Sequence, residues 1–275
     1  MLAVIALAGF AAAALGLLAA TPARAEPAHG RLVRFPSVPD PGEQPQALRG
    51  WLSEPAQVQG RGRLPAIVLM HGCGGPKAPS HRWAEQLVAW GFGALVLDSF
   101  GPRGIAQVCS APQRLSSRQR TADAYGALRF LQAQRDIDPD RIGLMGWSHG
   151  GSSALWAVER SWSRAHQPYP WLRFRATAVF YPGCAFQRAE FTTPVLMLMG
   201  AADDWTPANP CRMLVRTAHA SDGKVQLVIY PGATHAFDAV RMTVLAYGHV
   251  LRYNPGATVD AQGRVHEFLD KFLKR

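Results

Sequence analysis

The chain has 275 residues, of which 48% are apolar and 17% are charged. This composition is typical of a globular protein with a sizeable core, and it excludes an intrinsically disordered chain. The formal net charge is +10, but most basic residues are single arginines, with no Lys/Arg block and no basic stripe along a helix. The charge therefore predicts a solvated basic surface and no nucleic-acid partner.

The first 25 residues have the pattern of a secretory signal peptide. Residues 2–20 are apolar and uncharged, and Ala23-Arg24-Ala25 forms a small-x-small cleavage sequence. We expect an exported mature chain, periplasmic or secreted, that begins near Glu26 and has no stable membrane association. An uncleaved anchor is the alternative, because the segment before the apolar run has no Lys or Arg and the run is almost long enough to span a bilayer.

Hydrophobic patterning predicts strands that alternate with helices. Short apolar runs indicate strands buried on both faces, and apolar residues three or four apart indicate helices with one buried face. In chain order, we expect strands at 31–35, 47–53 and 64–70, a helix at 81–90, a strand at 94–97, a helix at 117–134, a strand at 141–145 and a helix at 152–158. Strands at 175–181, 195–199 and 225–230 and helices at 207–220 and 260–272 follow, whereas 99–116 and 161–172 are expected to be loops and 240–258 gives no clear pattern.

This order of elements favours a single α/β domain over residues 26–275. Strands that alternate with helices form a mostly parallel sheet with helices on both faces, and right-handed crossovers make such a sheet doubly wound. Sheets of this kind bind ligands at the carboxyl ends of their strands. The residues that carry the chemistry are therefore expected on the loops at that edge.

The most informative segment runs from Gly146 to Gly151 and reads Gly-Trp-Ser-His-Gly-Gly. It lies between a predicted buried strand and a predicted helix, and Gly-x-Ser-x-Gly in that place is the pattern of a nucleophile elbow. The glycines are needed because the sharp turn forces unusual backbone angles and close packing. Because a free serine is a weak nucleophile, Ser148 at this turn predicts a general base elsewhere in the chain.

An acid and a histidine follow the elbow serine in the chain order that such a site requires. Asp203 and Asp204 come directly after one predicted buried strand, and His235 comes shortly after the next. We expect His235 to take the proton of Ser148 and one aspartate to orient the histidine ring. At this point Asp203 and Asp204 are alternatives, and the second carboxylate would cap the helix that follows or pair with an arginine.

The oxyanion of the reaction needs two backbone N–H donors. One is expected from His149, directly after the nucleophile, and the other from Cys73 in the glycine-rich loop that runs from His71 to Gly75. We expect the side chain of His149 to point away from the serine. His71 is expected to form hydrogen bonds within its own loop and to take no part in catalysis.

Three further side chains are candidates for substrate binding. Trp147 and Trp205 are expected to line an apolar pocket, although aromatic residues near the end of a sheet belong to the core at least as often. Arg103 is expected either to pair with a substrate carboxylate or to be satisfied by the backbone of its own loop.

The four cysteines are Cys73, Cys109, Cys184 and Cys211. An even number in an exported chain favours disulfides, and the order of the loops favours the pairs Cys73–Cys109 and Cys184–Cys211. Four free, buried thiols are the alternative. No metal site is expected, because the chain has no Cys-x-x-Cys and no paired histidine spacing.

From Leu64 to the C-terminus the chain resembles the dienelactone hydrolase family of α/β-hydrolases. The resemblance depends on four segments taken together, which are 71–75, 146–151, 199–207 and 230–238. In the family the catalytic acid stands four residues before a proline, and this implies Asp203, since Pro207 follows it. The resemblance also implies the α/β-hydrolase fold and hydrolysis of esters or lactones without a cofactor.

The chain departs from the founding members of that family at two places. They use a cysteine nucleophile where this chain has Ser148, and they carry a glutamate near the oxyanion loop, whereas residues 73–80 contain no acid. Our hypothesis is a serine hydrolase that cleaves small esters or lactones through an acyl-enzyme on Ser148, Asp203 and His235. A serine peptidase of the prolyl oligopeptidase type and a non-catalytic binding protein on the same fold are the alternatives.

Overall fold

The computed structural model describes residues 30–40, 42–56, 62–166, 169, 171–186, 189–220, 225–240 and 242–274. The expected signal peptide at 1–25 lies outside these residues. Within the described part of the chain, no helix combines the length and the apolar character needed to cross a membrane.

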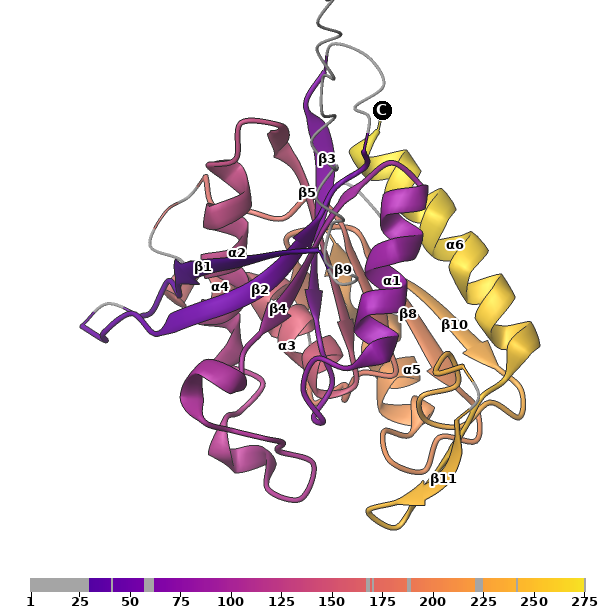
Figure 1. Ribbon diagram of the computed structural model, residues 1–275. Helices are drawn as coiled ribbons and strands as arrows, with labels where there is room; N and C mark the ends of the chain where they lie inside the picture. The colour runs from indigo at the N-terminus through magenta and orange to yellow at the C-terminus, as the bar shows by residue number, and fades with distance from the viewer. Residues whose placement is uncertain are drawn as a thin grey trace, which may run out of the picture.

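An eight-stranded sheet forms the centre of the molecule (Figure 1), with the strand order β1-β2-β4-β3-β5-β6-β8-β10. The first two strands pair antiparallel, as do β2 and β4, and every other pairing in this sheet is parallel. The strands are β1 (Arg31–Pro36), β2 (Ala47–Ser53), β3 (Leu64–Met70), β4 (Gly93–Asp98), β5 (Ile137–Trp147), β6 (Thr177–Phe180), β8 (Val195–Gly200) and β10 (Val225–Tyr230).

Helices cover both faces of this sheet. On one face α1 packs against β3 and β4 and α6 against β5 and β8, while α2 and α3 pack against β5 from the other side, as Figure 1 shows. The helices are α1 (Ala78–Ala89), α2 (Arg120–Gln132), α3 (His149–Val158), α4 (Arg160–His166), α5 (Ala208–Thr217) and α6 (Pro255–Leu273). The predicted doubly wound, mostly parallel sheet is therefore confirmed.

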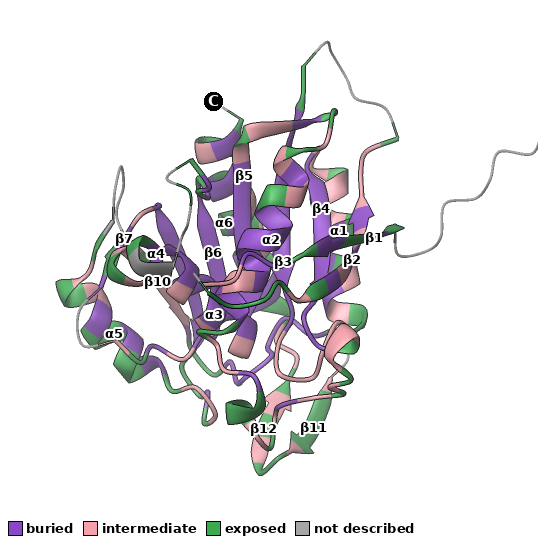
Figure 2. Ribbon diagram, turned by 90° about the vertical axis from the view of Figure 1, so that its left-hand side faces the viewer, coloured by how far each residue is buried: buried purple, intermediate pink, exposed green. Residues whose placement is uncertain are grey.

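The central strands are buried because they lie between the two layers of helices. Every residue of β3, β4, β6 and β8 is buried, as the purple strands in Figure 2 indicate. Such strands need apolar side chains on both faces, which explains why they are continuous apolar runs in the sequence. This rigid centre fixes the strand ends from which the loops of the site extend.

One predicted loop was wrong, because the first part of 161–172 forms α4. The carboxylate of Glu159 accepts hydrogen bonds from the Ser161 hydroxyl at 2.5 Å and from the Trp162 backbone N–H at 2.8 Å, and it thereby satisfies donors at the helix start. The indole ring of Trp162 also packs edge-on against that of Trp156, with the ring centroids 5.6 Å apart. An acidic residue directly before a helix is a sequence signal from which α4 could have been predicted.

The unassigned stretch 240–258 contains an antiparallel hairpin and the start of α6. The hairpin consists of β11 (Thr243–Ala246) and β12 (His249–Arg252), and it projects from the body of the molecule at the lower right of Figure 1. Asn254 caps the start of α6, and its side chain accepts a hydrogen bond from the Ala257 N–H at 3.0 Å. A capping asparagine followed by proline is a known start signal for a helix. One short parallel pair outside the main sheet, formed by β7 (Glu190–Phe191) and β9 (His219–Ala220), completes the described strands.

Candidate active site

The turn between β5 and α3 has the geometry of a strained elbow. Ser148 has φ 52° and ψ −120°, which L-residues rarely adopt. A Cβ on Gly150 would lie 2.2 Å from the Met70 carbonyl oxygen, and a Cβ on Gly146 would lie 2.3 Å from the Gly150 carbonyl oxygen. Only glycine fits at these two positions, so the glycine pattern follows from steric exclusion at the turn.

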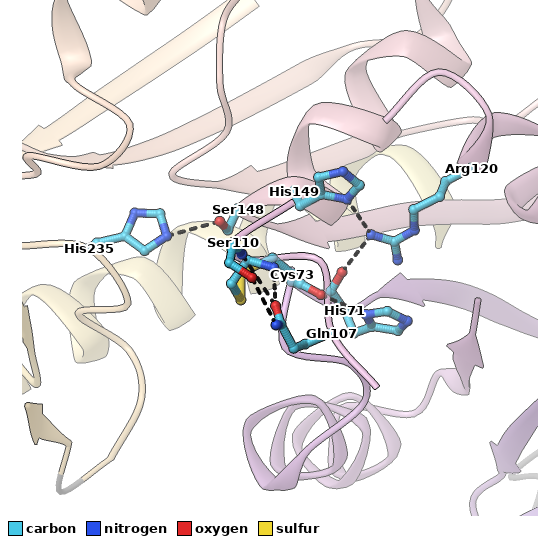
Figure 3. Close-up of a disulfide and its surroundings, with 10 residues drawn as sticks. His71, Cys73, Gln107, Ser110, Arg120, Ser148, His149 and His235 are labelled. Atoms are coloured by element: carbon cyan, nitrogen blue, oxygen red, sulfur yellow. Dashed lines mark hydrogen bonds between the residues drawn. A yellow bond between two sulfur atoms is a disulfide. The ribbon is translucent and has the colours of Figure 1, made fainter. Parts of the chain in front are cut away.

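The structure brings Ser148, His235 and Asp203 into one chain of hydrogen bonds. Nε2 of His235 lies 2.9 Å from the Ser148 hydroxyl oxygen, as Figure 3 shows, and Nδ1 donates to Oδ2 of Asp203 at 2.8 Å. His235 and Asp203 are 3% and 5% exposed, so water competes little for these bonds. The three residues follow β5, β8 and β10, and they meet at the carboxyl edge of the sheet.

Thr206 is a residue of this site that sequence reasoning missed. The Asp203 carboxylate accepts hydrogen bonds from the backbone N–H groups of Trp205 at 2.9 Å and Thr206 at 2.8 Å. The Thr206 hydroxyl lies 3.0 Å from Oδ2 of Asp203 and 3.1 Å from Nδ1 of His235. These contacts fix the aspartate in the orientation that a histidine partner needs.

Asp204 takes neither of the two roles expected for the second carboxylate. Its Oδ1 lies 3.5 Å from Nδ1 of His249 in the hairpin, and its side chain is 50% exposed. It therefore does not cap the next helix, and among the residues that the structure describes it pairs with no arginine. The two adjacent aspartates point in different directions because Asp203 turns inward to accept the backbone donors of its own loop.

The two expected oxyanion donors lie on either side of the elbow serine. Gly72 approaches the elbow so closely that a Cβ there would lie 3.5 Å from the Trp147 carbonyl oxygen and 3.7 Å from Cβ of Ser148. In the described part of the chain, no protein acceptor receives a hydrogen bond from the Cys73 N–H. The N–H of His149 belongs to the first turn of α3, where helical N–H groups have no partner within the helix.

One buried guanidinium group joins the two backbone segments that supply these donors (Figure 3). Nη1 of Arg120 donates to the His71 carbonyl oxygen at 3.0 Å and to Nδ1 of His149 at 3.0 Å. The His71 ring, as expected, bonds within its surroundings, with Nδ1 donating to the Gly72 carbonyl oxygen at 2.7 Å and Nε2 accepting from the Ser99 N–H at 3.3 Å. The side chain of His149 points away from Ser148 and toward Arg120.

Both of these histidines are held neutral. Burial, together with the charge of Arg120, lowers the pKa of His149 to about 3 and lowers the pKa of His71 well below its usual range. Burial also lowers the pKa of Arg120 to about 10, which leaves the guanidinium charged at neutral pH. A charged guanidinium therefore contacts both segments from which the oxyanion donors are expected.

The neutral state of His149 predicts a loss of stability on acidification. Its folded pKa is about 3, whereas an unfolded histidine titrates near about 6.5. The unfolded chain therefore binds a proton that the folded protein does not, and stability is lost as the pH falls from about 6.5 toward about 3. Urea unfolding measures the difference. Between about pH 7.5 and pH 5.5, the free energy of unfolding of wild type should fall by about 1 kcal/mol more than that of His149→Gln. Equal losses would contradict this explanation, because glutamine can accept from Arg120 but does not titrate.

A second buried carboxylate, Asp238, was also missed. It accepts hydrogen bonds from the indole N–H groups of Trp83 at 2.8 Å and Trp147 at 2.9 Å, and from the Tyr181 hydroxyl at 2.6 Å. Burial and the Asp238 charge together raise the pKa of Tyr181, so the phenol stays protonated and donates. The Tyr181 ring in turn lies 4.6 Å from the His235 ring. Asp238 thus holds two rings that lie beside the site, Trp147 and Tyr181.

Of the two expectations for Arg103, the structure favours the one in which groups of the protein itself satisfy the guanidinium. Its guanidinium forms two parallel hydrogen bonds to Asp123, at 2.9 and 2.8 Å, and a third to the Ser99 carbonyl oxygen at 2.6 Å. The Asp123 carboxylate is buried, and an unpaired buried charge would be costly, so this arginine is committed to it. By contrast, Trp147 and Trp205 both line a cavity beside Ser148, where they were expected.

All four cysteines form disulfides in the structure, in the pairs Cys73–Cys109 and Cys184–Cys211. The first bond ties the oxyanion loop to the loop after β4, and the Cys73 carbonyl oxygen there accepts from the Val108 N–H at 2.9 Å. Four free thiols, the alternative, are therefore absent. In the described part of the chain, no group of three or more His, Cys, Asp or Glu side chains could hold a metal ion.

The two disulfides offer a matched test, since they close loops of 36 and 27 residues. Each double serine variant should lower the free energy of unfolding by about 3–4 kcal/mol. Only Cys73→Ser/Cys109→Ser should also lower kcat/KM for ester hydrolysis, by roughly tenfold or more, because it loosens an oxyanion donor. Urea unfolding and initial rates on both variants check this, and equal activity in the two variants would contradict the role of the loop.

Comparisons with known proteins find one matching family and several similar proteins. A sequence model of the dienelactone hydrolase family matches residues 48–273. A Bradyrhizobium protein named "Probable 2-oxo-3-(5-oxofuran-2-ylidene)propanoate lactonase" is 27% identical over 206 residues, which cover 72% of this chain and 82% of that protein.

Solved structures show the same fold at low sequence identity. A Klebsiella pneumoniae structure that carries the dienelactone hydrolase name has a TM-score of 0.65 at 17% identity, with 88% of this chain and all of that chain covered. A Thermogutta terrifontis esterase with propionate bound has a TM-score of 0.61 at 18% identity, and the match covers 86% of this chain and 93% of that one.

Proposed function

The chain belongs to the dienelactone hydrolase family and is a hydrolase of ester bonds, and we propose that it is an exported serine hydrolase that cleaves carboxylic esters or lactones through an acyl-enzyme. Ser148 is the nucleophile, His235 the general base and acid, and Asp203 the residue that orients His235. The observation that carries this proposal is the hydrogen-bonded chain from the Ser148 hydroxyl through both nitrogens of His235 to Asp203, with distances of 2.9 and 2.8 Å.

The geometry supports a two-step reaction. The Ser148 oxygen attacks the carbonyl carbon while Nε2 of His235 takes its proton, and Asp203 stabilises the imidazolium that forms. The backbone N–H groups of Cys73 and His149 hold the oxyanion, and the charged guanidinium of Arg120 contacts both segments that supply them. His235 then protonates the leaving alkoxide, and a water activated by the same ring releases the acyl group from Ser148.

Export is supported by two independent features of the chain. The first 25 residues have the pattern of a cleaved signal peptide. The two disulfides are compatible with an oxidising compartment such as the periplasm or the exterior.

Small esters or lactones are proposed as substrates because of the names of similar proteins. One of them is named as a lactonase that acts on an oxofuranylidene propanoate, and a structural neighbour is named as an esterase. Both names describe acyl transfer from oxygen to water on a small molecule, which is the chemistry that a serine, histidine and aspartate in this geometry perform.

A substrate panel on the wild-type protein tests the proposal. Initial rates are measured for p-nitrophenyl acetate, an aliphatic γ-lactone and a peptide p-nitroanilide, with the fold monitored by circular dichroism. We expect the protein to turn over the ester or the lactone and to hydrolyse the anilide at a much lower rate. Faster hydrolysis of the anilide would favour the peptidase alternative, and a folded protein that turns over none of the three would favour the binding protein.

A further inference from the structure

Two cavities of different size meet at Ser148, and they divide an ester substrate into its two parts. We propose that this hydrolase prefers esters that combine a short acyl group with a large apolar alcohol, with the alcohol part in the larger cavity and the acyl part in the smaller one. This inference rests on the proposed function, because it uses the roles of Ser148 and His235.

The larger cavity has a volume of about 270 Å³ and opens toward the hairpin. Its walls are mostly apolar side chains, including Trp147, Tyr181 and Trp205 near the sheet and Val244, Tyr247 and Leu251 from the hairpin. Val244 and Tyr247 are 48% and 55% exposed, so the apolar wall continues past the mouth of the cavity. Exposed apolar side chains at the mouth of a site are typical of ligand-binding grooves.

The smaller cavity has a volume of about 150 Å³ and lies on the other side of the serine. Cys73, Cys109 and Val108 form one wall, and His149 and Thr206 form another. Val108 is fully buried, and the disulfide ties Cys73 and Cys109 together. The disulfide and the buried Val108 therefore fix one wall of this cavity.

The position of His235 assigns the two cavities. In the breakdown of the tetrahedral intermediate, the bond from the carbonyl carbon to the alkoxy oxygen breaks. That oxygen takes the proton from Nε2 of His235 and leaves as the alcohol, so it must lie within hydrogen-bond reach of the ring. His235 lines the larger cavity and not the smaller one. The alcohol therefore lies in the larger cavity.

The place of the acyl chain, the other part of the ester, follows by elimination. The oxyanion points at the N–H group of Cys73, which lines both cavities, and at that of His149, which lines only the smaller one, so it lies where the two cavities meet and leaves the smaller cavity for the remaining substituent. The acyl chain, which stays on Ser148 until water releases it as the carboxylic acid, therefore lies in the smaller cavity. At roughly 30 Å³ for each water-sized group, the two volumes hold about five groups for the acyl part and about nine for the alcohol.

A pair of isomeric esters tests the assignment without a change of overall hydrophobicity. Octyl acetate and ethyl octanoate have the same formula, but the long chain lies on the alcohol side in the first and on the acyl side in the second. In a pH-stat assay we expect kcat/KM for octyl acetate to be at least about tenfold higher, because a mismatched apolar pocket discriminates by that much. Equal values, the reverse order, or no turnover of either ester would overturn the inference.

A further substrate distinguishes an error in the proposed hydrolase function from an error in the assignment of the cavities. If p-nitrophenyl acetate is also not hydrolysed by the folded protein, the hydrolase proposal itself fails. If that ester is hydrolysed while the isomers show equal or reversed rates, only the assignment of the cavities fails.

A matched pair of hairpin variants tests the same assignment from the side of the protein. Val244 lines the larger cavity, whereas Leu245, its neighbour on the strand, is 74% exposed and does not line it. Val244→Asp should lower kcat/KM for octyl acetate by about fivefold or more, and by a larger factor than it lowers kcat/KM for ethyl acetate. Leu245→Asp should leave both substrates within about twofold. Equal effects of the two variants on octyl acetate would count against an alcohol site on this face of the hairpin.

Discussion

Replacement of Ser148 by alanine is expected to lower kcat/KM for p-nitrophenyl acetate by roughly 10⁴-fold or more. The hydroxyl oxygen is the atom that attacks the carbonyl carbon, and no other hydroxyl forms a hydrogen bond with Nε2 of His235 in the described part of the chain. Any residual rate would come from the oxyanion donors and from substrate binding alone. Initial rates, with protein concentration checked by absorbance, give the ratio.

Ser153→Ala is the matched control for this variant. Ser153 lies on α3, which begins directly after Ser148, and it is fully buried, but its hydroxyl donates to the His149 carbonyl oxygen at 2.9 Å and it lines neither cavity at Ser148. We expect it to retain activity within about threefold. If Ser148→Ala retained comparable activity while both variants unfolded as wild type does, another group would have to be the nucleophile.

Asp203→Asn should lower kcat by roughly 10⁴-fold, because an amide in place of the carboxylate favours the wrong tautomer of the histidine and does not stabilise the imidazolium. The neighbouring change Asp204→Asn removes the same charge from the same loop. The Asp204 side chain is half-exposed and lies 3.5 Å from His249, away from His235, so its variant should stay within about threefold of wild type.

This pair distinguishes a catalytic carboxylate from a general loss of negative charge. Steady-state rates of both variants across the pH range provide the comparison, with thermal melts to show that each is folded. A similar loss in both variants, or a larger loss in Asp204→Asn, would contradict the role given to Asp203.

The fold could be predicted from the sequence because its signals are local. The buried parallel strands are continuous apolar runs, and the steric requirement at the elbow leaves a glycine at both Gly146 and Gly150. The serine, the acid and the histidine each follow a strand, and they meet because parallel strands end at the same edge of the sheet.

The side chains that support the site could not be predicted, because their partners are distant in the chain. Arg120 reaches a carbonyl oxygen 49 positions before it, and Asp238 accepts from an indole that is 155 positions away. A buried arginine on a helix and an aspartate after an aromatic residue carry no local pattern that reveals such contacts. They are found only when packing brings the helices and loops together over the sheet.

The orientations of the Arg103 and Asp204 side chains could not be predicted from the sequence either. Sequence position placed both near the site, but Arg103 pairs with the buried Asp123, and Asp204 turns toward the hairpin. A charged side chain turns away from a cavity when a buried group of opposite charge needs it as a partner. The fold determines where that buried group lies.

The most direct test of the reaction chemistry is the site of covalent phosphonylation. The protein is incubated with a fluorophosphonate, digested, and its peptides are mapped by mass spectrometry, with Ser148→Ala and His235→Ala treated in parallel. We predict one adduct per chain on the peptide that contains Ser148, none in Ser148→Ala, and much slower labelling in His235→Ala. An adduct on any other residue, or undiminished labelling of Ser148→Ala, would contradict the serine hydrolase mechanism.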